Sequence, residues 1–155
     1  ALVNGGKLYS PRLLYASKPA GQERAKRLNA PLARQIPVLN ENNWDTVLGG
    51  MDQVVNGLRG TAKIVAVDAR HRTAGKTGTA QVYQLGVDKK YDNDEVAEHL
   101  RDHALFIAFA PVENPRIAIA VVVEHGGAGS RAAAPVARAT LDAWLDQEIE
   151  PESLP

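Results

Sequence analysis

The sequence predicts an α+β fold in which helices flank an antiparallel sheet. Apolar residues recur at helical spacing in residues 44–60 and 132–148. Three stretches of strand character lie between residues 73 and 124, and a short turn with two prolines, "PVENPR", joins the last two. Such a turn is typical of a hairpin, which pairs its strands antiparallel. We interpret the 155 residues as a portion of one domain.

Residues 1–43 are predicted to be a helix end followed by a connector. The opening "ALVNGG" is typical of the last turn of a helix, with a left-handed C-cap at Asn4-Gly5-Gly6. Because only that last turn is present, we expect the chain to begin inside a domain. The connector holds four prolines and a solvated basic cluster, with short strands predicted in residues 7–16 and 33–40.

Residues 44–60 are predicted to be an amphipathic helix. Its apolar residues fall on one face: Trp44, Val47, Leu48, Met51, Val54, Val55 and Leu58. Asn42 or Asn43 is expected to cap the start of the helix. Gly57 or Gly60 is expected to end it.

The sheet is predicted over residues 73–124, with strands at 73–83, 103–110 and 116–124. The excursion 84–102 is too long for a hairpin loop, and excursions of that length often border functional sites. The third strand contains the continuous apolar run "IAIAVVV", which predicts that both its faces are covered. A glycine-rich turn, "HGGAGS", then leads into the C-terminal helix at 132–148.

Composition excludes several classes of function. The chain has no cysteine, which excludes disulfides, thiolate zinc sites and a cysteine nucleophile. Lys plus Arg equals Asp plus Glu at 18 each, so the charge gives no reason to expect nucleic acid as a partner. His99 and His103 are spaced i,i+4, but no third ligand or H-E-x-x-H motif accompanies them. We therefore expect no metal and no cofactor.

The stretch "TAGKTGTAQV", residues 73–82, has two chemical interpretations. A nucleotide-binding loop requires a glycine where Arg70 stands and a helix after the motif, and this sequence meets neither requirement. A strand would instead present the cation of Lys76, the hydroxyls of Thr77 and Thr79, and bare backbone at Gly78. That set suits an extended peptide that ends in a carboxylate. On composition alone, an edge strand with a merely solvated lysine remains an alternative.

The same stretch resembles a known family. "AGKTGTAQV" is similar to the third active-site motif, K-T-G, of the penicillin-binding protein and serine β-lactamase superfamily. "WDTVLGGMDQVVNGLRGTA", "HALFIAFAP" and "VVVEHGGAGSRAAAPVARATLDAWL" are similar, in this order, to the C-terminal portion of class B transpeptidase domains. "LRDHALFIAFAP" with "EHGGAGS" most resembles the penicillin-binding protein 2 group, the transpeptidases of rod-shape elongation. The opening "ALVNGGKLYSPRLL" resembles the segment that follows the second motif.

The resemblance implies a role for each residue of the motif. Lys76 would join the polar network around the nucleophile. Thr77 and Thr79 would bind the terminal carboxylate of a D-Ala-D-Ala stem peptide, or of a β-lactam that imitates it. The backbone N–H of Thr79 would be one of two oxyanion-hole donors, and Gly78 would let the substrate pair with the strand.

The nucleophile of the family is not in this chain. Its serine belongs to an S-x-x-K motif, and the second motif is S-x-N. The serines of the chain are Ser10, Ser17, Ser130 and Ser153. None has lysine three positions later or asparagine two positions later. Because acyl transfer requires a nucleophile, we expect the chain alone to be inactive and the upstream part of the same domain to supply the serine.

The resemblance implies a peptidoglycan D,D-transpeptidase, a β-lactam target that works through an acyl-enzyme. It further implies a parent protein on the periplasmic side of the bacterial inner membrane, anchored by an N-terminal transmembrane helix outside this chain. The implied protein partners are a membrane SEDS-family glycosyltransferase and elongation-complex proteins. Two alternatives stay open: a non-catalytic peptide-binding module of the same fold, and a serine β-lactamase.

Overall fold

The computed structural model describes residues 1–82 and 96–147. It confirms the α+β class, with an antiparallel sheet flanked by helices. The chain divides into two compact units, residues 1–48 and 49–155. Within the described residues, none of the helices has the length and apolar character needed to cross a membrane.

The first unit is built on antiparallel ladders within residues 7–35. After the short 3-10 helix η1 (Leu2–Asn4) come β1 (Lys7–Tyr9), β2 (Ala16–Ser17), β3 (Lys26–Arg27) and β4 (Leu32–Gln35). β1 pairs with β4 and β2 pairs with β3. The predicted C-cap is observed, since Gly5 has a φ of 58°. β3 holds two residues of the basic cluster Arg24, Lys26 and Arg27, which the sequence predicted to be a solvated face, and both residues of β3 are exposed.

Helix α1 spans Asn42–Asn56 and begins earlier than predicted. Its cap is Asn40, whose side-chain oxygen accepts the backbone N–H of Asn42 at 3.0 Å. The prediction that Asn42 or Asn43 caps the helix was therefore wrong, because both residues already lie inside it. At the other end the last helical residue is Asn56, and the N–H of the next residue, Gly57, bonds to the carbonyl oxygen of Gln53 at 3.0 Å. Of the two glycines predicted to end the helix, Gly57 is therefore the one that follows it, and the helix stops before residue 60.

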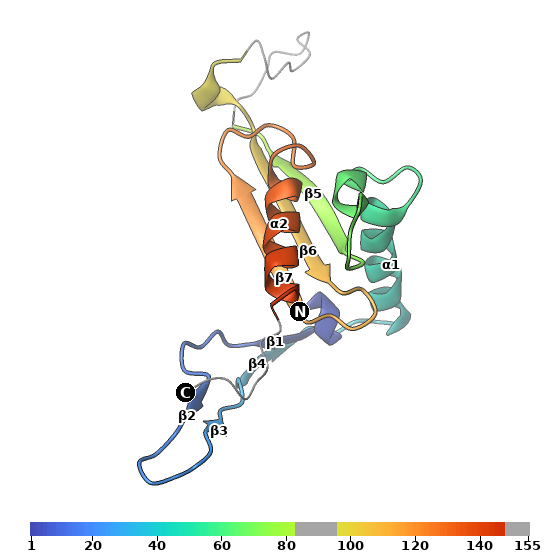
Figure 1. Cartoon of the computed structure of the whole chain (residues 1–155). Coiled ribbons are helices and arrows are strands. Elements are labelled where there is room, and N and C mark those ends of the chain that lie inside the picture. The colour runs from blue at the N-terminus through green and yellow to red at the C-terminus, as the bar shows by residue number, and fades with distance from the viewer. Residues whose placement is uncertain (83–95, 148–155) are drawn as a thin grey trace. The chain divides into compact units, whose positions relative to one another are not determined.

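The second unit contains a three-stranded antiparallel sheet in the order β5-β6-β7. Its strands are β5 (Ala74–Ala80), β6 (His103–Ala110) and β7 (Ile117–Val123). β6 is central, and β5, which carries the K-T-G motif, lies at one edge (Figure 1). Residues 83–95 lie outside the described residues, so most of the predicted excursion does too; the described remainder contains the 3-10 helix η3 (Glu98–Leu100).

Helix α2 (Ala133–Leu145) packs across β6 and β7 (Figure 1). The face it presents begins with small residues, which allow the helix backbone to approach the sheet closely. A second 3-10 helix, η2 (Lys63–Ala66), packs against α2. The core of this unit consists of Val55, Ala62, Val65, Ala104, Phe106, Ala108, Ala110, Ala133, Ala134, Ala137 and Leu141.

The two faces of β7 differ in exposure. One set of alternating residues is half-buried and packs toward the core. The other set, Ala118, Ala120 and Val122, is exposed, and Val122 keeps 60% of its surface accessible. The prediction that both faces are covered was therefore wrong for the described part of the chain, because α2 covers one face only.

Phe106 is the largest side chain in this core and has no exposed surface. We expect Phe106→Ala to lower the free energy of unfolding by about 3–5 kcal/mol, because it removes a buried ring and leaves a cavity. Urea denaturation measures this loss. In the same measurement on this chain alone, the neighbouring Ile107→Ala serves as the control, since Ile107 lies on the opposite face and is 44% exposed. Equal losses for both variants would contradict the burial of β6 against α2.

Candidate functional site

The start of β5 is anchored to the C-terminal half of α1 by one polar cluster. Arg72 donates to both carboxylate oxygens of Asp52, from Nε at 2.9 Å and from Nη2 at 2.8 Å. The Asn56 side-chain amide donates to Asp52 Oδ1 at 2.8 Å and to the carbonyl oxygen of Thr73 at 2.9 Å. A bidentate, charge-assisted pair fixes both distance and orientation. The residues that lead into the K-T-G strand are thus held in a defined position.

Asp52 is ionised in this cluster. The Arg72 guanidinium lowers the pKa of the Asp52 carboxyl, an effect that burial opposes and the hydrogen bond from Asn56 reinforces. Sequence reasoning missed this cluster. The only signal was an Asp and an Asn four residues apart on the helix, and the partner Arg72 is separated from Asp52 by 20 positions.

Lys76 and the two threonines lie on opposite faces of β5, as strand alternation predicts. Thr77 and Thr79 pair with Phe106 and Ala104, the buried residues of β6 that face α2. Lys76 pairs with Ile107 on the other face. Its Nζ donates to the carbonyl oxygen of Thr77 at 2.6 Å, which brings the ammonium back to the strand. A cation and two hydroxyls therefore lie along one short stretch of edge strand.

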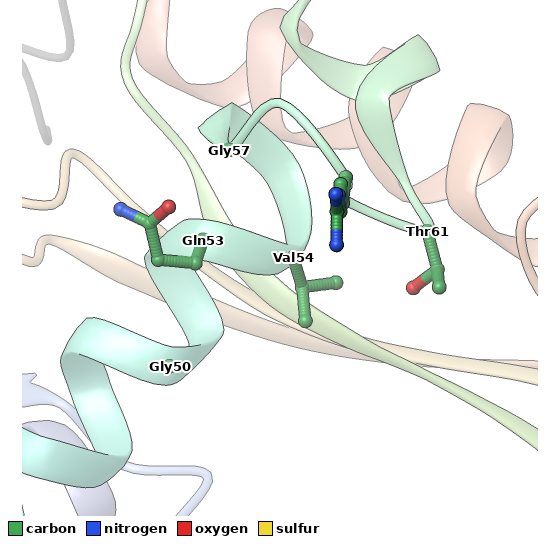
Figure 2. Close-up of a pocket in the computed structure, with 7 residues that line it drawn as sticks. Gly50, Gln53, Val54, Gly57 and Thr61 are labelled. Atoms are coloured by element: carbon green, nitrogen blue, oxygen red, sulfur yellow. The ribbon is translucent and has the colours of Figure 1, made fainter.

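Thr61, in the loop after α1, is a neighbour of the motif that the sequence did not reveal. Its hydroxyl lies 3.3 Å from the hydroxyl of Thr77. Thr61 also lines a surface hollow of about 250 Å³, together with Gly50, Gln53, Val54, Gly57, Arg59 and Gly60 (Figure 2). Arg59 is the one charged residue in this lining, which has no carboxylate or imidazole for acid–base chemistry. We therefore place the candidate site at β5 and not in the hollow.

Gly78 keeps the middle of the motif free of side chains. It pairs with Leu105, and a methyl group at Gly78 would meet the Cβ of Leu105 at 3.2 Å. Because β5 is an edge strand in the described sheet, its outer side can accept another extended chain. Bare backbone at this point suits the close approach of such a chain.

The histidines form no metal site among the residues that the structure describes, where no group of three or more His, Asp or Glu gathers. The side chain of His103 contacts His125. Its Nδ1 accepts the backbone N–H of His125 at 3.0 Å, and the two rings meet edge to face at 4.9 Å between centroids.

Comparison with known families gives a match over most of the chain. Residues 1–142 match the family described as "Penicillin binding protein transpeptidase domain". Among curated proteins, the peptidoglycan D,D-transpeptidase MrdA of Haemophilus influenzae is 38% identical over 148 residues, which is 96% of this chain. The match spans about a fifth of that relative, 22% of its length.

Solved structures of penicillin-binding proteins are also similar to this chain. Penicillin-binding protein 2 (PBP2) of Pseudomonas aeruginosa, solved in complex with WCK 5153, is 38% identical with a TM-score of 0.65, over 96% of this chain and 29% of that one. PBP2 of Helicobacter pylori, solved in complex with MreC, is 27% identical with a TM-score of 0.56, over 76% of this chain and 21% of that one.

The Asp52–Arg72 pair predicts how stability depends on pH. The folded-state pKa of Asp52 lies below its unfolded value of about 3.9. The pair therefore stabilises the fold fully above that unfolded value, and the contribution is lost as the pH falls toward the folded pKa. We expect Asp52→Asn to lower the melting temperature at pH 7 and to flatten its decline in acid.

Thermal melts between pH 7 and pH 3 test this expectation. Glu113→Gln is the matched control, because Glu113 is exposed and lies 4.0 Å from the Arg72 Nε. An Asp52→Asn variant whose acid decline is as steep as that of the parent would contradict a role for this pair.

Proposed function

We propose that this chain, which belongs to the penicillin-binding protein transpeptidase domain family, forms the substrate-binding wall of a serine D,D-transpeptidase. The observation that carries the proposal is the K-T-G strand itself. It is an edge strand with an ammonium, two hydroxyls and bare backbone within four consecutive residues. The name of the Haemophilus relative, a peptidoglycan D,D-transpeptidase, supports the reaction.

In this proposal each residue of the motif acts on one part of the substrate. The stem peptide, or a β-lactam, lies antiparallel to β5 and its terminal carboxylate accepts hydrogen bonds from Thr77 and Thr79. The serine oxygen attacks the penultimate carbonyl carbon and forms an ester, while the amide bond to the terminal D-Ala breaks. The serine proton passes through the polar network that includes Lys76 to the nitrogen of the departing D-Ala. The backbone N–H of Thr79 stabilises the negative charge that develops on the carbonyl oxygen. Losing such a donor costs about 3 kcal/mol of barrier.

The serine belongs to the remainder of the domain. Support comes from the exposed sheet face on the side of Lys76, where Ile107 and Val122 keep 44% and 60% of their surfaces accessible. An apolar sheet face of this kind is normally covered. We propose that the upstream part of the domain packs there, which would bring its S-x-x-K and S-x-N motifs next to the ammonium of Lys76.

The proposal extends to the setting of the parent protein. The Helicobacter neighbour was solved as a complex of PBP2 with MreC, which supports elongation-complex proteins as partners. We further propose a membrane SEDS-family glycosyltransferase as a partner and an anchor in the inner membrane, with this domain on the periplasmic side. Co-purification of the parent with either protein tests the partner assignment.

Covalent labelling with fluorescent penicillin tests the division of the site. We expect a polypeptide with the upstream motifs and this chain to be labelled, and this chain alone to remain unlabelled, because it has no S-x-x-K serine. A label that persists for hours indicates a transpeptidase, whereas rapid loss of the label indicates a β-lactamase. Covalent labelling of this chain alone would contradict the proposal.

Removing one hydroxyl tests the carboxylate-binding role. We expect Thr77→Val in the full-length protein to lower the second-order rate constant of acylation by about 10- to 100-fold, because a hydrogen bond to a charged group contributes about 1.5–3 kcal/mol. Stopped-flow measurements with a fluorescent penicillin give this constant. Thr140→Val is the matched control, since the hydroxyl of Thr140 bonds within α2 to the Val136 carbonyl. Equal rates for the Thr77 and Thr140 variants would contradict carboxylate binding at Thr77.

A further inference from the structure

Gly129, in the turn before α2, lies close to the backbone of the K-T-G strand at Gly78. Gly129 is buried, and a methyl group built on it would overlap the carbonyl oxygen of Leu105. The same methyl group would lie 2.7 Å from the carbonyl oxygen and 3.2 Å from the nitrogen of Gly78. These neighbours are backbone atoms, which cannot rotate away as a flexible side chain can.

Gly129 cannot retreat from the strand, because helix α2 holds it in place. Its carbonyl oxygen accepts the N–H groups of Ala133 and Ala134, at 3.1 and 2.9 Å, in the first turn of the helix. Ala133 and Ala134 have no exposed surface, and Leu141, near the other end of α2, keeps only 1% of its surface exposed. An added methyl group would therefore push on the backbones of both β6, at Leu105, and β5, at Gly78. In the described sheet β6 is paired on both sides and β5 on one side only, so β5 is the strand that we expect to move.

The face on which Gly129 lies is the face of the two threonines. Thr77 and Thr79 flank Gly78 and pair with the β6 residues that face α2. Gly129 lies four positions before the first residue of that helix, and a methyl group on it would meet the Gly78 backbone between the two threonines. The absence of a side chain at Gly129 therefore leaves the backbone of β5 undisturbed at the residue between the two threonines.

We propose that Gly129 is a positioning residue for acylation: it sets the path of β5 at Gly78 and so places the Thr79 N–H at the reacting carbonyl. This inference rests on the proposed transpeptidase function. A side chain at Gly129 would shift the strand by about half an ångström or more, and misplacement on the order of 1 Å costs as much as 100-fold in rate.

The test is Gly129→Ala in the full-length protein, with acylation by a fluorescent penicillin resolved into the binding constant and the rate of the covalent step. We expect the rate of the covalent step to fall about 10- to 100-fold per active site, counted by titration with the same probe. A merely structural role predicts a lower melting temperature and fewer active sites, with an unchanged rate per site. That result would overturn the proposal.

Two glycines of the same chain provide matched controls. The three atoms nearest to a methyl group on Gly126, in the same turn, belong to the side chains of Val123 and Ala132 and not to β5, so Gly126→Ala should lower stability without slowing the covalent step. A methyl group on Gly49, in α1, has open space, so Gly49→Ala should raise stability by about 1 kcal/mol, because Ala favours the helix, and leave the covalent step unchanged. If Gly126→Ala slows the covalent step as much as Gly129→Ala does, the effect is not specific to Gly129 and the proposal is wrong.

A measurement on the unmodified protein covers the case in which Gly129→Ala does not fold. If Gly129 sets the path of β5, acylation by penicillin should slow amide hydrogen exchange in residues 126–132 together with residues 74–80. Slower exchange in the strand alone would refute the coupling. An unmodified protein that penicillin does not acylate refutes the proposed function instead, so the two failures are distinguishable.

Discussion

The contact between α2 and the central strand β6 is the constraint on which the rest of the second unit depends. Phe106, Ala133 and Ala134 are completely buried in it, so the start of the helix and the middle of the sheet have one fixed separation. The register of β5 against β6 then determines which motif residues face the helix and which face away. The chemistry proposed for the edge strand follows from a packing contact that contains no catalytic group.

An edge strand that binds a peptide must stay open on one side without becoming mobile. β5 meets this requirement through contacts that, among the residues the structure describes, leave its outer edge without a paired strand. The Asp52–Arg72 pair and Asn56 hold its beginning, seven main-chain pairings hold its inner side, and Gly129 bears on its middle. A binding surface held in this way is organised before substrate arrives, which reduces the entropy lost on binding.

Much of this architecture could be predicted from the sequence, because it rests on local patterns. Helical spacing located α1 and α2, and the residues around the K-T-G motif predicted a strand that presents Lys76, Thr77 and Thr79. The features that could not be predicted from the sequence depend on tertiary contacts. The pairing of Asp52 with Arg72, the approach of Thr61 to Thr77 and the contact of Gly129 with Gly78 each join segments that are distant in the sequence. The apolar run of β7 predicted two covered faces, whereas the described residues cover only one. The reason is related, since hydrophobicity reports that a face is suited to burial and not which segment buries it.

The uncovered face of the sheet also affects how the polypeptide behaves before the domain is complete. β7 is an edge strand of the described sheet and contains seven consecutive apolar residues without a charge or a proline. Segments of this composition readily add strands from other molecules and initiate aggregation. If the upstream part of the domain packs on this face as proposed, the strand is a site for aggregation whenever that packing is incomplete.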